Sequence, residues 1–260
     1  MKTVRLETDR RGVATLTLTR SEKRNAMSAE MIRELAAATR QMAEDDAVRA
    51  VVMAGEGPTF CAGGDLDWMR AQMAADDETR RSEARALAMM LKALNELPKP
   101  LVARVHGDAF GGGIGIMSVC DAVIVSETAR FGLTETRLGL IPATIGPYVA
   151  ARLGAGPARR IFTSPRLFGA EEAVALGLVS VSVAEDQLDL AIENEVSPYL
   201  NAAPGAVAEG KALLRRLSAS VDEAAIDASI DALVTRWASD EADEGTAAFF
   251  DRRRPRWAED

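Results

Sequence analysis

Histidine and cysteine are nearly absent from this sequence. Its 260 residues contain one histidine, His106, and two cysteines, Cys61 and Cys120. Two cysteines exclude a disulfide-stabilised scaffold and are typical of a reducing compartment, so we expect a cytoplasmic protein. So few histidines and cysteines argue against a structural zinc cluster, and we expect no bound metal. A serine–histidine mechanism would need His106, but no Gly-x-Ser-x-Gly motif supplies its nucleophile. We therefore interpret His106 as a strand-end residue that hydrogen-bonds to backbone.

Positive charge and long apolar runs are also scarce. The formal net charge is −8, which argues against a nucleic-acid partner, because such proteins need a basic face for phosphates. No apolar stretch reaches the length of a membrane span, and the first residues lack a signal-peptide core, so no membrane association is expected. A composition with 48% hydrophobic and 27% charged residues is ordinary for a globular protein of moderate size.

Strand and helix patterns alternate along the first two thirds of the chain. Two runs flanking Arg11-Gly12 predict a hairpin, and Ser28 is placed to cap a following helix. A long amphipathic helix is expected to end before Pro98. Strands alternating with helices predict an α/β fold with mainly parallel pairing. The expected strands, besides the hairpin, cover residues 50–53, 101–105, 122–125 and 178–183.

After about residue 185 only helical patterns remain. The segment 201–205, which contains Pro204 and Gly205, is a plausible joint. We therefore divide the chain into a core over residues 1–200 and a helical region over residues 201–260. The apolar residues of that helical region must pack on their own core or on another subunit.

Two glycine-bearing loops carry the clearest chemical signal. They cover residues 60–66 and 106–113, and each follows an apolar run and leads into a helical pattern. Glycine lets backbone N–H groups approach a ligand closely, and a helix start supplies free N–H donors. If the loops meet in space, their N–H groups can hold an oxygen that gains negative charge, as in an oxyanion hole.

With these loops the chain resembles the enoyl-CoA hydratase/isomerase family, also called the crotonase family. The resemblance spans nearly the whole length, and its motifs occur in the family's order. They are Arg24-Asn25-Ala26-Met27, the loop 60–66, the glycine-rich segment ending in Cys120-Asp121, Phe131-Gly132-x-x-Glu135, Gly139-Leu140-Ile141-Pro142 and Leu176-Gly177-Leu178-Val179.

The resemblance implies a fold and an assembly. The family fold is an α/β, crotonase-type spiral of β-β-α turns, followed by an all-helical trimerisation region. Family members form homotrimers, and many pair into hexamers. They act on acyl-CoA thioesters and need no cofactor beyond the coenzyme A that is part of the substrate.

The resemblance also implies the catalytic groups. The backbone N–H groups of Gly64 and Gly112 match the family's oxyanion donors, and Glu135 matches its catalytic carboxylate. Two preorganised donors suit the enolate that forms when water adds to an unsaturated thioester, where losing one donor typically costs about 3 kcal/mol. Taken alone, Glu135 would be an ordinary helix N-terminal charge and the loops ordinary tight turns.

Further residues match positions that contact the substrate. Arg24 and the backbone of Ala26 and Ala62 match coenzyme A contacts, although a solvated Arg24 is equally expected from the sequence. The full set expected to bind substrate is Arg24, Ala26, Ala62, Gly64, Asp65, Leu66, Trp68, Gly112 and Pro142. Asp65 is also placed to cap a helix, and Trp68 to shape the acyl pocket. The segment 249–254 resembles the family tail, which can reach a neighbouring subunit's site.

One position departs from the common hydratase pattern. Gly115 stands where many members carry a second glutamate, which leaves Glu135 as a single acid and base. The segment 141–149 resembles branched-chain hydratases, such as methylglutaconyl-CoA and isohexenylglutaconyl-CoA hydratases, so we favour a hydratase of branched-chain acyl-CoA or fatty acid catabolism. Two alternatives stay open: a Δ3,Δ2-enoyl-CoA isomerase with the same site, and a non-catalytic protein that binds CoA thioesters.

Overall fold

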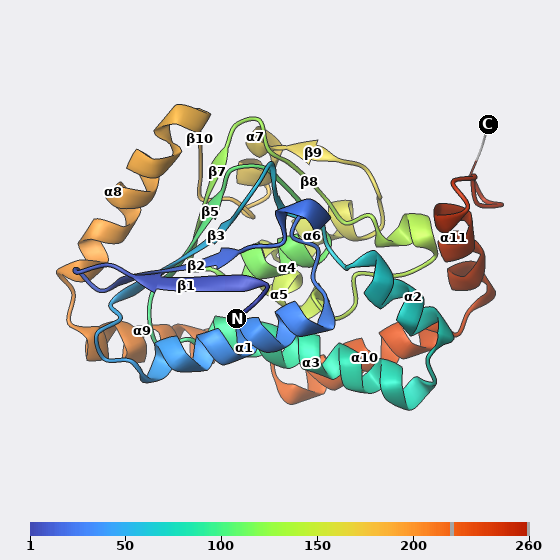
Figure 1. Ribbon diagram of the computed structural model, residues 1–260, viewed down its shortest axis with the longest axis horizontal. Helices are drawn as coiled ribbons and strands as arrows, with labels where there is room; N and C mark the ends of the chain where they lie inside the picture. Colours follow the sequence, from blue (N-terminus) through green and yellow to red (C-terminus); the bar gives the residue numbers. More distant parts are fainter. Residues whose placement is uncertain (219–220, 259–260) are drawn as a thin grey trace.

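The larger of two β-sheets is the backbone of the molecule. In this computed structural model, which describes residues 1–218 and 221–258, its strand order is β1-β2-β3-β5-β7-β10 (Figure 1). The predicted hairpin is confirmed, because β1 pairs antiparallel with β2. All other neighbours in this sheet are parallel, as predicted. The strands are β1 (Val4–Thr8), β2 (Val13–Leu18), β3 (Ala50–Gly55), β5 (Leu101–Val105), β7 (Ala122–Ser126) and β10 (Val181–Val183).

A smaller sheet interleaves with the larger one along the chain. Its order is β4-β6-β8-β9, and only the β8–β9 pair is antiparallel. Each of three successive β-β-α units therefore adds one strand to each sheet, which is the predicted spiral. The strands are β4 (Thr59–Cys61), β6 (Asp108–Phe110), β8 (Arg130–Gly132) and β9 (Phe168–Gly169).

Helices begin where the sequence places caps. The Ser28 hydroxyl accepts a hydrogen bond from the backbone N–H of Met31, and Asp65 caps the next helix in the same way, both as predicted. The long helix predicted before Pro98 is α3. The α-helices are α1 (Ala29–Glu44), α2 (Leu66–Ala74), α3 (Asp77–Glu96), α4 (Gly112–Val119), α5 (Gly146–Leu153), α6 (Ala155–Phe162), α7 (Ala170–Ala175), α8 (Leu188–Leu200), α9 (Pro204–Leu217), α10 (Glu223–Trp237) and α11 (Asp240–Phe250). Short 3-10 helices are η1 (Ser21–Lys23), η2 (Glu135–Leu138) and η3 (Glu185–Gln187).

The larger sheet is buried on both faces. Because side chains alternate along a strand, Val51 and Met53 of β3 join the main core with α1, α3 and α4, whereas Ala50 and Val52 face the other way. That second face packs against α8 through Leu188, Ile192 and Val196. Burial on both faces explains the continuous apolar runs that marked these strands in the sequence.

One predicted strand is shorter than expected. The sequence predicts a strand over residues 178–183, but β10 contains only Val181–Val183. Gly177 has φ +81° and ends the preceding helical turn, so the N–H groups of Leu178 and Val179 bond to the carbonyl of Ala173. Pairing with β7 starts at Ser180, whose N–H donates to the carbonyl of Val123.

The C-terminal helices pack onto the core rather than apart from it. Ile226, Ile230 and Val234 of α10 bury against Ala84 and Ala88 of α3. In Figure 1, α10 runs along α3, and α11 lies beside α2. No helix in residues 1–218 and 221–258 is both long enough and apolar enough to cross a bilayer.

Candidate active site

The two glycine loops meet where β4 and β6 end. A Cβ atom on Gly63 would lie only 3.2 Å from the carbonyl oxygen of Phe110, so the loops touch backbone to backbone. Gly63 has φ +93° and Gly111 has φ +47°, conformations that favour glycine. The two loops therefore meet in space, which is the condition for a shared oxyanion hole.

Backbone geometry leaves two N–H groups free to act together. Met27 and Gly64 form a parallel bridge in which Met27 donates to the Gly63 carbonyl and accepts from the Asp65 N–H. The N–H of Gly64 therefore points away from Met27's backbone, as alternate groups of a ladder do. Gly112 is the first residue of α4, so its N–H lacks an intrahelical acceptor. Both glycines line one cavity.

Glu135 lies at the same place. It begins η2 shortly after the end of β8, and a Cβ atom on Gly111 would lie 2.8 Å from its Oε1. Its Oε2 is buried without a hydrogen-bond partner among the described residues. Burial away from water disfavours the carboxylate and raises the pKa of Glu135 from 4.5 to about 7. A carboxyl group with such a pKa can accept and return a proton near neutral pH.

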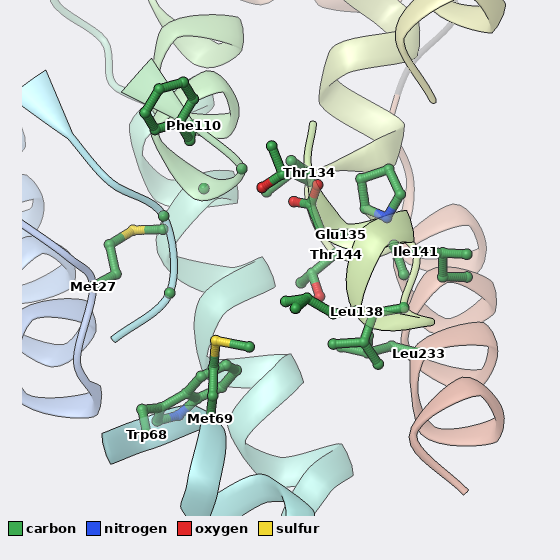
Figure 2. Close-up of a pocket in the computed structure, with 18 of the residues that line it drawn as sticks. Met27, Trp68, Met69, Phe110, Thr134, Glu135, Leu138, Ile141, Thr144 and Leu233 are labelled. Carbon is green, nitrogen blue, oxygen red and sulfur yellow. The ribbon is translucent and has the colours of Figure 1, made fainter. Parts of the chain in front are cut away.

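An apolar cavity of about 460 Å³ extends from these groups (Figure 2). Among the residues predicted to bind substrate or catalyse, it is lined by Ala62, Gly64, Leu66, Trp68, Gly112, Glu135 and Pro142. The Trp68 indole N–H donates to Glu83 Oε2 over 3.0 Å, which fixes the ring. A cavity of this size and character suits an acyl chain.

Three predicted contacts lie outside the cavity lining. Arg24 is exposed, with φ +51°, and its carbonyl accepts from the Ala62 N–H. The carbonyl of Ala26 accepts from Arg20 over 2.6 Å. Asp65 caps α2 and forms an ion pair with Arg20 at 2.9 Å. These are structural roles, and the contacts of Arg24, Ala26 and Asp65 with substrate remain predictions.

Comparison with known proteins decides the family. Residues 8–260 match the family model described as "Enoyl-CoA hydratase/isomerase". This chain belongs to the enoyl-CoA hydratase/isomerase family. It is 31% identical over 252 residues to "Enoyl-CoA hydratase AFT3-1" of Alternaria alternata, covering 96% of this chain and 84% of the relative.

Solved structures agree with the family fold. An enoyl-CoA hydratase from Mycobacterium smegmatis superposes with a TM-score of 0.80 at 35% identity, covering 99% of both chains. AtuE from Pseudomonas aeruginosa does so with a TM-score of 0.81 at 38% identity, covering 99% of this chain and 100% of that one. The crotonase-type architecture with its C-terminal helices is therefore shown.

Packing explains why residue 115 is a glycine here and not the second glutamate of many family members. A Cβ atom on Gly115 would lie 2.5 Å from Cγ2 and 3.0 Å from Cβ of Ile145. Ile145, at the start of α5, thus fills the space in which a longer side chain at residue 115 would begin. No second carboxylate lines the cavity among the described residues.

Other residues that line the cavity were not predicted from the sequence. Leu233 and Trp237 of α10 line the cavity, as do Thr144 and Ile145. The helical spacing of Leu233 and Trp237 marks a buried face but not which cavity it faces. Phe249, within the tail that resembles the family's, lines the cavity of its own chain.

The single histidine has the structural role predicted for it. His106 follows β5, and its Nε2 lies 2.6 Å from the carbonyl oxygen of Gly57. Partial burial lowers the pKa of His106, which favours the neutral ring. Both cysteines are buried and free.

Proposed function

We propose that this protein is an enoyl-CoA hydratase that adds water across the 2,3 double bond of an acyl-CoA thioester. The observation that carries the proposal is the convergence on one cavity of the Gly64 and Gly112 N–H groups and the buried Glu135 carboxyl. The named hydratases among its relatives support the same activity.

The proposed mechanism balances with one carboxylate. The thioester oxygen accepts hydrogen bonds from Gly64 and Gly112, which stabilise the enolate as it forms. Glu135 takes a proton from water while the water oxygen bonds to C3 and the π electrons move toward the thioester oxygen. The enolate then reforms the carbonyl, and C2 takes the same proton back from Glu135. The product carries OH on C3 and H on C2, with no change of oxidation state and no further cofactor.

Coenzyme A contacts, assembly and location belong to the proposal. Arg24 is exposed beside the loop that carries Ala62, which suits a contact with a coenzyme A phosphate. Assembly into homotrimers or hexamers and a cytoplasmic location remain predictions; the buried free cysteines are compatible with a reducing compartment.

The activity is tested by following the ultraviolet absorbance of conjugated thioesters. We expect crotonyl-CoA to lose absorbance as water adds. Glu135→Gln should reduce this rate by at least about a hundredfold, because general acid–base catalysis contributes that much or more. The fold and affinity for coenzyme A should stay unchanged, as measured by circular dichroism and calorimetry.

Two outcomes favour the alternatives. An isomerase would create absorbance from a 3-enoyl-CoA while leaving crotonyl-CoA intact. A non-catalytic protein would bind coenzyme A and convert neither thioester.

A branched acyl group that ends in a carboxylate is the substrate class we favour. Arg137 lines the cavity, and its guanidinium forms no ion pair or hydrogen bond within residues 1–218 and 221–258. A cation at the cavity suits a terminal carboxylate. The resemblance of segment 141–149 to methylglutaconyl-CoA hydratases points to the same class. We expect kcat/KM to be higher for 3-methylglutaconyl-CoA than for crotonyl-CoA, and the reverse order would argue for an unbranched substrate.

A further inference from the structure

A threonine hydroxyl lines the cavity without a hydrogen-bond partner in residues 1–218 and 221–258. Thr144 is 4% exposed and lines the cavity. Among the described residues nothing hydrogen-bonds to its hydroxyl. Unlike Glu135 Oε2, the Thr144 hydroxyl oxygen is not fully enclosed, so a water molecule in the cavity can reach it and hydrogen-bond to it.

The backbone holds Thr144 in a fixed turn between Pro142 and α5. The Ala143 N–H donates to the Ile141 carbonyl at 2.8 Å, and the Gly146 N–H donates to the Ala143 carbonyl at 2.9 Å. Its neighbour Ile145 is wedged against Gly115. Figure 2 shows the side chains of Thr144 and Glu135 directed into the cavity, across from Met27.

Few other polar groups are available on this cavity. Besides Glu135 and Thr144, the polar side chains that line it among the described residues are Trp68, Thr134 and Arg137. The Trp68 N–H is occupied by Glu83, and Arg137 is exposed to solvent. Thr134 is only partly buried. Thr144 is thus the more buried of the two neutral hydroxyl side chains that line the cavity among the described residues.

A water molecule that attacks C3 needs more than one hydrogen-bond partner. Ordered waters in proteins make two to four such bonds, and Glu135 supplies one. Gly115 has no side chain, and Ile145 fills the space beside it, so no second glutamate is present there to give the water another hydrogen bond. We propose that the Thr144 hydroxyl holds the attacking water together with Glu135, an inference that rests on the proposed hydratase function.

The step remains balanced with Thr144 in this role. One O–H of the water donates to Glu135, which removes that proton, and the other donates to Thr144 Oγ1. The water's lone pair is then free to form the bond to C3. Thr144 neither gains nor loses a proton, and it belongs to the hydration step alone.

The test separates water addition from enolate formation. Thr144→Val keeps the side-chain shape but removes the hydroxyl, and Thr144→Ser restores it. For Thr144→Val we expect kcat for hydration of crotonyl-CoA to fall about tenfold or more, the loss of roughly one hydrogen bond, with little change in KM. Thr144→Ser should recover most of that loss. Exchange of the C2 protons of butyryl-CoA in D2O, which needs Glu135 but no attacking water, should persist in Thr144→Val.

A control variant and three outcomes complete the design. Thr163→Val removes an exposed hydroxyl on another part of the fold and should leave hydration unchanged. Equal loss of hydration and proton exchange in Thr144→Val would show general damage and overturn the proposal. A change in KM alone would assign the hydroxyl to acyl binding and also overturn it. A wild-type protein that exchanges C2 protons but hydrates no 2-enoyl-CoA would refute the proposed function itself, and this inference with it.

Discussion

At the scale of single residues, the proposed chemistry depends on a carboxyl group placed where water solvates it poorly. Glu135 begins a short 3-10 helix over Gly111, and one of its oxygens has no polar partner among the described residues. Burial of this kind favours the protonated acid and raises the pKa of Glu135 to about 7. The same burial that makes the group a useful proton carrier also makes its charged form costly to the fold.

The shifted pKa predicts how the rate depends on pH. Water activation needs the carboxylate, so kcat/KM for hydration should rise with pH and level off above a midpoint near 7. A rise of kcat/KM with its midpoint near pH 4.5, the ordinary glutamate value, would contradict the burial argument.

The pH dependence of the folding stability should have the opposite sign. Between pH 4.5 and 7 the Glu135 carboxyl is ionised in the unfolded chain but still protonated in the folded protein. Glu135 therefore lowers the free energy of unfolding as pH rises. Glu135→Gln should remove that decline in chemical-denaturation curves.

At the scale of elements, close helix contacts decide the shape of the site. Gly115 of α4 faces Ile145 of α5, and Gly245 of α11 packs directly on the backbone of Leu138 in η2. Arg236 of α10 also donates to the Gly139 carbonyl over 2.6 Å. The C-terminal helices therefore support the segment that carries Glu135.

The Gly115–Ile145 contact predicts coupled stability effects. Gly115→Ala places a methyl group against Ile145 and should cost about 1–3 kcal/mol by overpacking. Ile145→Ala should cost about 2–5 kcal/mol by leaving a cavity. The double variant should be less destabilised than the sum, since each change relieves the other. Urea unfolding measures all three, and strict additivity would show that the two side chains do not share this space.

The contact between α11 and η2 predicts a loss of catalysis. A Cβ atom on Gly245 would collide with the backbone at Leu138 and Gly139, which cannot yield as a side-chain tip can. Gly245→Ala should displace η2 and lower kcat about tenfold or more, since small misplacements of catalytic groups are costly. The matched control is Gly156→Ala on α6, where no atom lies within 4 Å of the added methyl group. Steady-state kinetics well below the melting temperature compares them, and equal kcat values would contradict this positioning role.

At the scale of the whole molecule, one helix retains an apolar surface. Leu213, Leu214 and Leu217 of α9 are 47%, 64% and 75% exposed. Exposed apolar clusters of this kind mark contacts with other molecules. The family resemblance predicts that a second copy of this chain covers this surface.

The exposed leucines predict a measurable assembly defect. We expect the wild-type protein to sediment as three or six chains. The double variant Leu214→Asp with Leu217→Asp should shift it toward smaller species, because charge buried at an interface is costly. Circular dichroism serves as the control that the chain itself still folds. Sedimentation of the wild type as a single 27.7 kDa chain would contradict the predicted assembly.

Local sequence was enough to predict much of the fold and part of the site. The hairpin at Gly12, the caps at Ser28 and Asp65 and the buried strands follow from turn chemistry, capping and periodicity, which act over a few residues. The glycine loops and Glu135 could be singled out for the same reason, together with the family resemblance. The strand predicted over residues 178–183 was partly wrong, because Gly177 sends the next N–H groups back to α7.

Other features depend on residues that are far apart in the chain. Only the packed molecule brings Ile145 against Gly115, turns Leu233 of α10 into the cavity and leaves the Thr144 hydroxyl without a partner among the residues that the structure describes. No local pattern encodes such contacts, because they follow from how whole helices pack. The sequence by itself determined the elements, the glycine loops and the single carboxylate. The tertiary structure decided which groups surround that carboxylate, since burial and exclusion of water exist only once distant segments have met.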